Sequence, residues 1–229
     1  MTREHSPVGA EGLEELYPFL YAGSSDLEAV LAQVRQSTVD KAHEIIALRR
    51  TVLEADRERI VACAQDMAAA FAAGGRLLAF GNGGSSTDAQ DLASVFLSPA
   101  GDERPLPAFG LTNDIAVVTA LSNDIGFDVV FARQIAAFGR AGDIAVGLST
   151  SGNSANLLRA FDEAARRGMV TVGIAGYDGG KMAELDTVDH LFVVPSASVH
   201  RIQEAQTTLY HALWELTLGA LDDLEGDRQ

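Results

Sequence analysis

The sequence has a single cysteine among its 229 residues, so no disulfide bond can form within the chain. No apolar run approaches the length of a membrane-spanning helix, and the polar residues 1–15 lack the basic start and apolar stretch of a signal peptide. Cys63 lies in a helical pattern, which favours a buried structural thiol over a reactive one. These absences predict a cytoplasmic protein without a membrane partner.

Basic residues are also scarce. The chain carries 17 Lys and Arg against 32 Asp and Glu, which gives a formal net charge of −15 and a pI near 4.6. The arginine pairs, such as Arg49-Arg50 and Arg166-Arg167, have acids nearby and are typical of solvated helix faces. Such a chain repels the backbone of nucleic acids, so no nucleic-acid partner is expected. An anionic substrate is also repelled at long range, so its site must depend on short-range N–H and hydroxyl contacts.

Five short apolar runs alternate with helical patterns in the later part of the chain. The expected strands cover residues 76–81, 107–112, 143–149, 170–175 and 191–195. Helices are expected at 87–97, 115–120 with 127–138, 155–167, 182–185 and about 201–224. Continuous apolar strands separated by helices predict an α/β fold, with a parallel five-stranded sheet and helices on both faces.

Residues 26–73 have apolar side chains at helical spacing, which predicts two or three helices that end at Gly74-Gly75. The preceding acidic residues are interpreted as an extension over 1–25, and residues 26–225 as a single domain with an N-terminal helical arm. One small sheet cannot bury the apolar faces of this many helices. We therefore expect some of the apolar surface to contact another subunit. The alternative is a helical cap on the chain's own sheet.

Two turns rich in glycine and hydroxyl residues follow the first and third expected strands. The first is Gly-Asn-Gly-Gly-Ser-Ser-Thr over residues 81–87, and the second is Ser-Thr-Ser-Gly-Asn-Ser over 149–154. Each opens a helix, and bare N–H groups at a helix N-terminus form a seat for phosphate. Neither turn has the lysine of a Walker loop or the spacing of a dinucleotide fingerprint, so a small phosphorylated metabolite is the expected ligand. The plainer alternative is a tight connection with a helix cap.

Three stretches of the chain resemble the sugar isomerase (SIS) domain family, and within it the phosphoheptose isomerases. They are Gly81-Asn82-Gly83-Gly84-Ser85 with Asp88-Ala89-Gln90, residues 149–154, and Arg201-Ile202-Gln203-Glu204. The resemblance covers about residues 40–222. It implies a flavodoxin-like sheet, a homotetramer, and a sugar phosphate ligand, with interconversion of sedoheptulose 7-phosphate and a seven-carbon aldose phosphate.

The resemblance also implies roles for individual residues. The expected substrate-binding residues are Asn82, Gly83, Gly84, Ser85, Asp114, Asp124, Ser149, Thr150, Ser151, Ser154 and Gln203. Family enzymes place a catalytic His on the last helix, present here as His211, and a catalytic Glu after the first turn, where this chain has Val95. Asp91 replaces a family His and lies four residues before Val95, hence on the same helix face. Asp91 and Glu204 are therefore the candidate acids beside His211.

Because of Val95 and Asp91, the sequence does not decide whether the chain binds a metal ion or whether it is catalytically active. The family's Glu, Gln and two His can hold zinc, and Asp91, Gln203 and His211 remain here as a thin candidate ligand set. No other cofactor is expected. One function is an aldose–ketose isomerase in which His211 works with Asp91 or Glu204. The other is a sugar-phosphate-binding protein without catalysis that acts on a protein partner, similar to the DnaA initiator-associating protein, which lacks the same Glu.

Each candidate catalytic residue also has a structural interpretation. His211 lies among apolar residues and could be a packed core histidine. Asp91 could be a surface acid, and Glu204 an ion-pair partner of Arg201.

Overall fold

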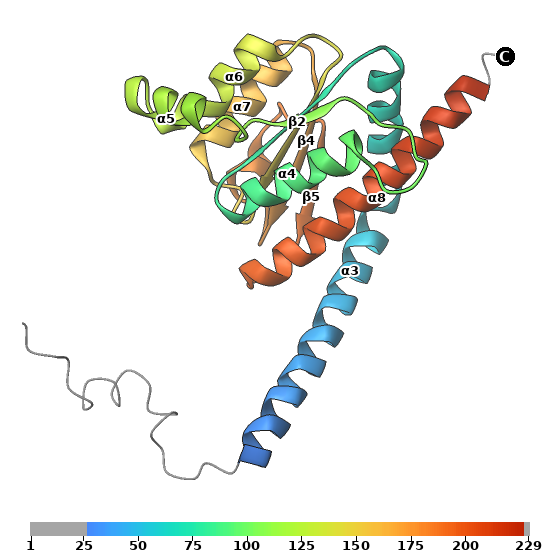
Figure 1. Ribbon diagram of the computed structural model, residues 1–229, viewed down its shortest axis with the longest axis vertical. Helices are drawn as coiled ribbons and strands as arrows, with labels where there is room; N and C mark the ends of the chain where they lie inside the picture. The colour runs from blue at the N-terminus through green and yellow to red at the C-terminus, as the bar shows by residue number, and fades with distance from the viewer. Residues whose placement is uncertain (1–26, 227–229) are drawn as a thin grey trace, which may run out of the picture. The chain divides into compact units, whose positions relative to one another are not determined.

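The computed structural model describes residues 27–226 (Figure 1). One long helix is followed by five strands that alternate with helices, and a further long helix ends the described region. None of the helices in this range has the length and hydropathy needed to cross a membrane. The expected extension over residues 1–25 lies outside the described residues, and the division of the chain at residue 26 stays a prediction.

A single helix, α3 (Leu27–Ala72), occupies the region for which the periodicity predicts two or three helices. That prediction is wrong because the 46 residues contain no glycine or proline to interrupt the helix. The predicted stop at Gly74-Gly75 is correct, and Gly74 has a positive φ of 86°. Of the described residues, 27–44 belong to a separate unit, in which Val30, Leu31 and Val34 are exposed. The homotetramer stays a prediction.

Five parallel strands form one sheet. They are β1 (Leu77–Gly81), β2 (Ala108–Gly110), β3 (Ile144–Ser149), β4 (Val170–Gly176) and β5 (His190–Val194). The order β2-β1-β3-β4-β5 confirms the predicted flavodoxin-like sheet. The chain passes from β1 outward to β2 and resumes at β3 on the other side of β1, so the direction of winding reverses between β1 and β3. Ligands of such sheets bind at the carboxyl ends of the strands that flank this point.

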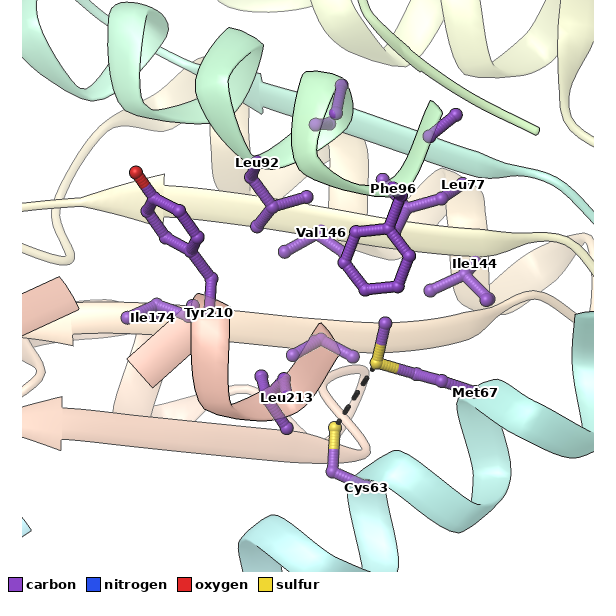
Figure 2. Close-up of a cluster of buried hydrophobic side chains, with 14 of the residues drawn as sticks. Cys63, Met67, Leu77, Leu92, Phe96, Ile144, Val146, Ile174, Tyr210 and Leu213 are labelled. Atoms are coloured by element: carbon purple, nitrogen blue, oxygen red, sulfur yellow. Dashed lines mark hydrogen bonds between the residues drawn. The ribbon is translucent and has the colours of Figure 1, made fainter. Parts of the chain in front are cut away.

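Helices cover both faces of the sheet (Figure 1). On one face α4 (Gly84–Leu97), α8 (Val199–Gly226) and residues 60–72 of α3 enclose a core that includes Met67, Phe96 and Leu213 (Figure 2). On the other face α6 (Val130–Phe138) and α7 (Ala155–Arg166) pack Phe131 and Phe161 against Phe80 of β1. The shorter helices are α5 (Ile115–Asp124), η1 (Phe127–Val129) and η2 (Gly180–Glu184). Because α4 and α8 share one face, their polar residues meet beside the β1 turn.

Cys63 is fully buried in the core beneath α4 and α8, as its helical pattern predicts. Its Sγ lies 3.9 Å from Sδ of Met67 (Figure 2). Burial, together with the carboxylates of Asp66 and Asp189, raises the pKa of the thiol. We therefore expect the native protein to resist iodoacetamide at mildly alkaline pH and to take up one label per chain after unfolding in urea, measured by intact mass. Rapid labelling while the far-ultraviolet circular dichroism stays native would contradict this placement.

Candidate active site at the carboxyl ends of β1 and β3

The two glycine-rich turns follow β1 and β3, which are neighbours in the sheet. Gly81, the last residue of β1, pairs with Leu148 near the end of β3. The first turn leads into α4 and the second into α7. Parallel strands end at the same edge of a sheet, so the N-termini of both helices open at this edge.

The first turn presents free hydrogen-bond donors. Gly83 has a φ of 55° and precedes α4 without a side-chain cap. Among the described residues, no acceptor is found for the N–H groups of Gly83 and Gly84, whereas the N–H of Ser85 donates to the carbonyl of Asn82. Ser85 is buried, and its hydroxyl makes no hydrogen bond within the same range. Two backbone donors and one hydroxyl are thus available at the start of α4.

The second turn is held in shape by its own side chains. The Ser149 hydroxyl accepts a hydrogen bond from the N–H of Gly152 at 3.0 Å. The Asn153 amide donates to the Ser151 carbonyl at 2.9 Å and accepts from the Lys181 N–H at 3.0 Å. Ser154 precedes α7 and makes no side-chain cap. Thr150, Ser151 and Ser154 are partly exposed, and the first two N–H groups of α7, residues 155 and 156, have no acceptor in the described chain.

A reciprocal pair of amide hydrogen bonds joins the two turns. Asn82 Nδ2 donates to Asn156 Oδ1, and Asn156 Nδ2 donates to Asn82 Oδ1, each at 2.9 Å. Asn82 is a predicted sugar contact, and in this structure its amide holds the turns at a fixed spacing. The buried Asn156 was missed by the sequence reasoning, although it stands only two residues after Ser154 at the start of α7.

Gln203 of α8 lies against the first turns of α4. Its Nε2 donates to Asp88 Oδ2 at 3.1 Å. A Cβ added at Gly84 would overlap the same amide nitrogen, so glycine permits this close approach. Burial raises the pKa of Asp88, with a smaller contribution from Asp91, while the Gln203 hydrogen bond opposes the rise. The structure thus brings Gln203 to the first turn and adds Asp88, which the motif contains but to which the sequence reasoning assigned no role.

Asp91, Tyr210 and His211 meet where α4 contacts α8. The Tyr210 hydroxyl donates to Asp91 Oδ2 at 2.5 Å, and His211 Nε2 lies 3.9 Å from the same oxygen. The Tyr210 ring is buried, whereas the side chains of Asp91 and His211 are 56% and 43% exposed. Burial and the hydrogen bond to Asp91 raise the pKa of Tyr210, so the phenol remains a protonated donor at neutral pH. A carboxylate and an imidazole are therefore held together with access to solvent.

Glu204, the other predicted acid, lies apart from this group. Its side chain is exposed and forms an ion pair of 2.5 Å with Arg201. This contact confirms the structural interpretation of Glu204 as the ion-pair partner of Arg201. Among the described residues, no hydrogen bond or ion pair joins it to Asp91 or His211.

Asp114 and Asp124 lie at the two ends of α5. The Asp114 carboxylate caps the helix by accepting the N–H groups of its second and third residues at 3.0 and 3.1 Å. Asp124 accepts a hydrogen bond of 2.8 Å from Asn123. Both are exposed, and their contact with a sugar stays a prediction.

Two further residues that support the turns were missed by the sequence reasoning. The buried Gln206 amide donates to the carbonyls of Ser149 and Ile174, at the ends of β3 and β4. The Thr112 hydroxyl, after β2, lies 2.7 Å from the Ser86 hydroxyl and accepts from Gln90. Neither residue belongs to a glycine-rich turn, so only the fold reveals these contacts.

Comparison with known proteins agrees with this architecture. The profile of the SIS domain matches residues 42–176. The chain belongs to the SIS domain family. Among SIS proteins it is similar to the phosphoheptose isomerase of Roseiflexus sp. (strain RS-1), with 44% identity over 179 residues, 78% of this chain and 90% of the relative. The phosphoheptose isomerase of Aquifex aeolicus is 41% identical over 174 residues, 76% of this chain and 90% of the relative.

Solved SIS structures superpose on the chain as well. The phosphoheptose isomerase of Neisseria gonorrhoeae gives a TM-score of 0.71 at 39% identity and covers 80% of this chain and 97% of its own. The enzyme of Francisella tularensis gives 0.75 at 32% identity with the same coverage. These matches confirm the resemblance and the fold predicted from the sequence.

The zinc that the SIS resemblance implies does not fit the side chains of this site. Within residues 27–226 no group of three His, Cys, Asp or Glu is placed to hold a metal ion. Of the predicted ligands, Asp91 Oδ2 accepts from Tyr210 and the Gln203 amide donates to Asp88. Val95 supplies no donor where the family has a carboxylate. One imidazole and one carboxylate are too few for a tight zinc site, which uses at least three protein ligands.

Proposed function

We propose that the chain is a sugar-phosphate isomerase that interconverts an aldose and a ketose phosphate, with sedoheptulose 7-phosphate as its substrate. The proposal follows from the similarity to phosphoheptose isomerases and from the arrangement of α4. This helix carries phosphate-seat donors at Gly84 and Ser85 and an acid seven residues later at Asp91. Seven residues of helix span about 10 Å, which is close to the length of an extended sugar phosphate.

The phosphate would bind where the N-termini of α4 and α7 open. The available hydrogen-bond donors are backbone N–H groups and the hydroxyls of Ser85, Thr150, Ser151 and Ser154. The positive ends of two helix dipoles favour a dianion at this point. Such short-range contacts are needed because the net charge of −15 disfavours the approach of an anion.

Isomerisation requires a proton to leave one carbon next to the carbonyl group and to reach the neighbouring carbon. We assign this transfer to the His211 imidazole, which accepts the proton from C1 of the ketose and returns it to C2. The hydroxyl proton passes from O1 to O2 of the enediol through solvent, to which the pair is open. The Asp91 carboxylate, 3.9 Å from the ring, stabilises the imidazolium formed in between. Glu204 takes no part, because it is paired with Arg201.

Val95 favours a second function, a SIS protein that binds sugar phosphate and regulates or assembles with a protein partner without catalysis. Valine neither accepts a proton nor donates one, so the family's usual carboxylate is absent at this position. The isomerase is preferred because an imidazole and a carboxylate still meet at the expected end of the ligand.

The two functions differ in proton exchange. For the isomerase we expect saturable heat when sedoheptulose 7-phosphate is titrated in a calorimeter. We also expect deuterium at C1 or C2, followed by NMR, when the ketose phosphate is incubated with the protein in deuterated water. Binding without exchange would favour the second function, and the absence of binding by heptose and pentose phosphates would refute both. Val95→Glu is a companion variant, because exchange gained only on restoring the Glu would show that the remaining site is intact.

A further inference from the structure

Tyr210 contacts both members of the Asp91–His211 pair. Its hydroxyl donates to Asp91 Oδ2 at 2.5 Å, and its ring stacks on the His211 ring with a centroid distance of 5.2 Å and an interplanar angle of 27°. Of the two Asp91 carboxylate oxygens, only Oδ2 has a partner among the described residues. One side chain thus orients the carboxylate through a hydrogen bond and restricts the imidazole through ring contact.

The position of Tyr210 is itself fixed by packing. The residue is 1% exposed and belongs to the core cluster that contains Leu92 and Phe96 of α4 and Leu213 of α8. Figure 2 shows the ring beside Leu92, with the hydroxyl pointing towards α4. Packing holds the buried ring in one orientation, so its hydroxyl is a rigidly placed donor. The Asp91 side chain that accepts from it is 56% exposed and otherwise free to rotate.

We propose that Tyr210 is a positioning residue that holds the Asp91 carboxylate beside His211. A metal ion could not orient these two side chains instead, because the described residues offer it no complete ligand set. The inference rests on the proposed function, since the pair it orients is the one assigned to proton transfer. Tyr210 is not one of the predicted site residues. Its hydrogen bond explains how an exposed carboxylate can keep a fixed geometry without the family's Glu. Tyr210 acts through Asp91 and does not exchange protons with the substrate.

The test is a double-mutant cycle on the rate of deuterium incorporation from sedoheptulose 7-phosphate. Tyr210→Phe removes only the hydroxyl and keeps the buried ring. We expect it to lower kcat about tenfold, which corresponds to the loss of one hydrogen bond to a charged group, with little change in KM. In the Asp91→Ala background the same substitution is expected to change kcat by less than about twofold, because the oriented group is already gone. An unchanged kcat in Tyr210→Phe, or an equal loss in both backgrounds, would overturn the inference.

NMR of the ligand-free protein separates this inference from the proposed function. We expect a downfield Tyr210 hydroxyl proton that disappears in Asp91→Ala, and a change in the His211 ring nitrogen shifts in Tyr210→Phe at constant pH. The inference fails if either signal is unaffected, whatever the activity. Wild-type protein that binds the sugar phosphate but exchanges no deuterium would refute the isomerase alone. Zinc ions added alone in a calorimeter should bind wild type no more tightly than Asp91→Ala, and tighter binding that this variant loses would overturn the orienting role of Tyr210.

Discussion

Replacement of His211 by Gln is expected to lower the rate of isomerisation by about 10²- to 10⁴-fold, the usual contribution of a general acid or base. Glutamine keeps a polar side chain of similar length but cannot accept and return a proton. The donors proposed for the phosphate lie on α4 and the two turns, two helical turns away from the Asp91–His211 contact, so binding of sedoheptulose 7-phosphate should change by less than about threefold. The measurements are deuterium incorporation for the rate and calorimetry for the affinity.

His200→Gln is the matched control, since His200 is exposed in the first turn of α8 and belongs to no part of the site. It should leave both quantities unchanged. If His211→Gln instead retained most of the rate, the proton would have to be moved by another group, and the assignment of the Asp91–His211 pair would be wrong. If the variant lost both rate and affinity together with thermal stability, His211 would be supporting the fold and not moving a proton.

The sheet and the positions of the two glycine-rich turns could be predicted because they depend on local patterns. The central strands β1, β3 and β4 are short apolar runs buried on both faces, and the two glycine-rich turns interrupt the first two of these runs at residues 81 and 149. Once five such strands alternate with helices, the parallel topology brings the turns to one edge. The length of α3 differs from the prediction because the three apolar clusters indicate two or three helices, although no glycine or proline between 27 and 72 breaks the helix.

The side-chain contacts of the site could not be predicted in the same way. Gln203 and Asp88 are 115 residues apart and Tyr210 and Asp91 are 119 apart, and each pair meets only because α8 packs beside α4. No periodicity reports which polar residues face one another across two helices. At Asp114 the sequence pattern does not distinguish two roles. An aspartate before a helix can cap the helix or contact a ligand with the same carboxylate, and in this structure it caps α5. The motif therefore places the site, and packing decides which of its residues are in contact.

The substitution Gly152→Ala is expected to disrupt the second turn. Gly152 has a φ of 66°, and a Cβ there would overlap the carbonyl oxygen of Gly179, a backbone atom of the neighbouring loop. The left-handed conformation alone costs a non-glycine residue about 1 to 2 kcal/mol, and the overlap adds to this because one of the two loops must move. We expect a loss of more than about 2 kcal/mol in the free energy of unfolding, or a fall of roughly 4 to 8 °C in Tm.

Gly74→Ala separates the two causes of this loss. Gly74 also has a positive φ, 86°, but a Cβ there meets no atom within 4 Å. It should therefore cost only the conformational term of about 1 to 2 kcal/mol and leave sugar-phosphate binding unchanged. Gly152→Ala, by contrast, should weaken binding about tenfold for each charged hydrogen bond that the displaced turn no longer makes. Equal losses of Tm in the two variants would show that the contact with Gly179 is not restrictive. Full affinity in a destabilised Gly152→Ala protein would mean that the phosphate is held by the first turn alone.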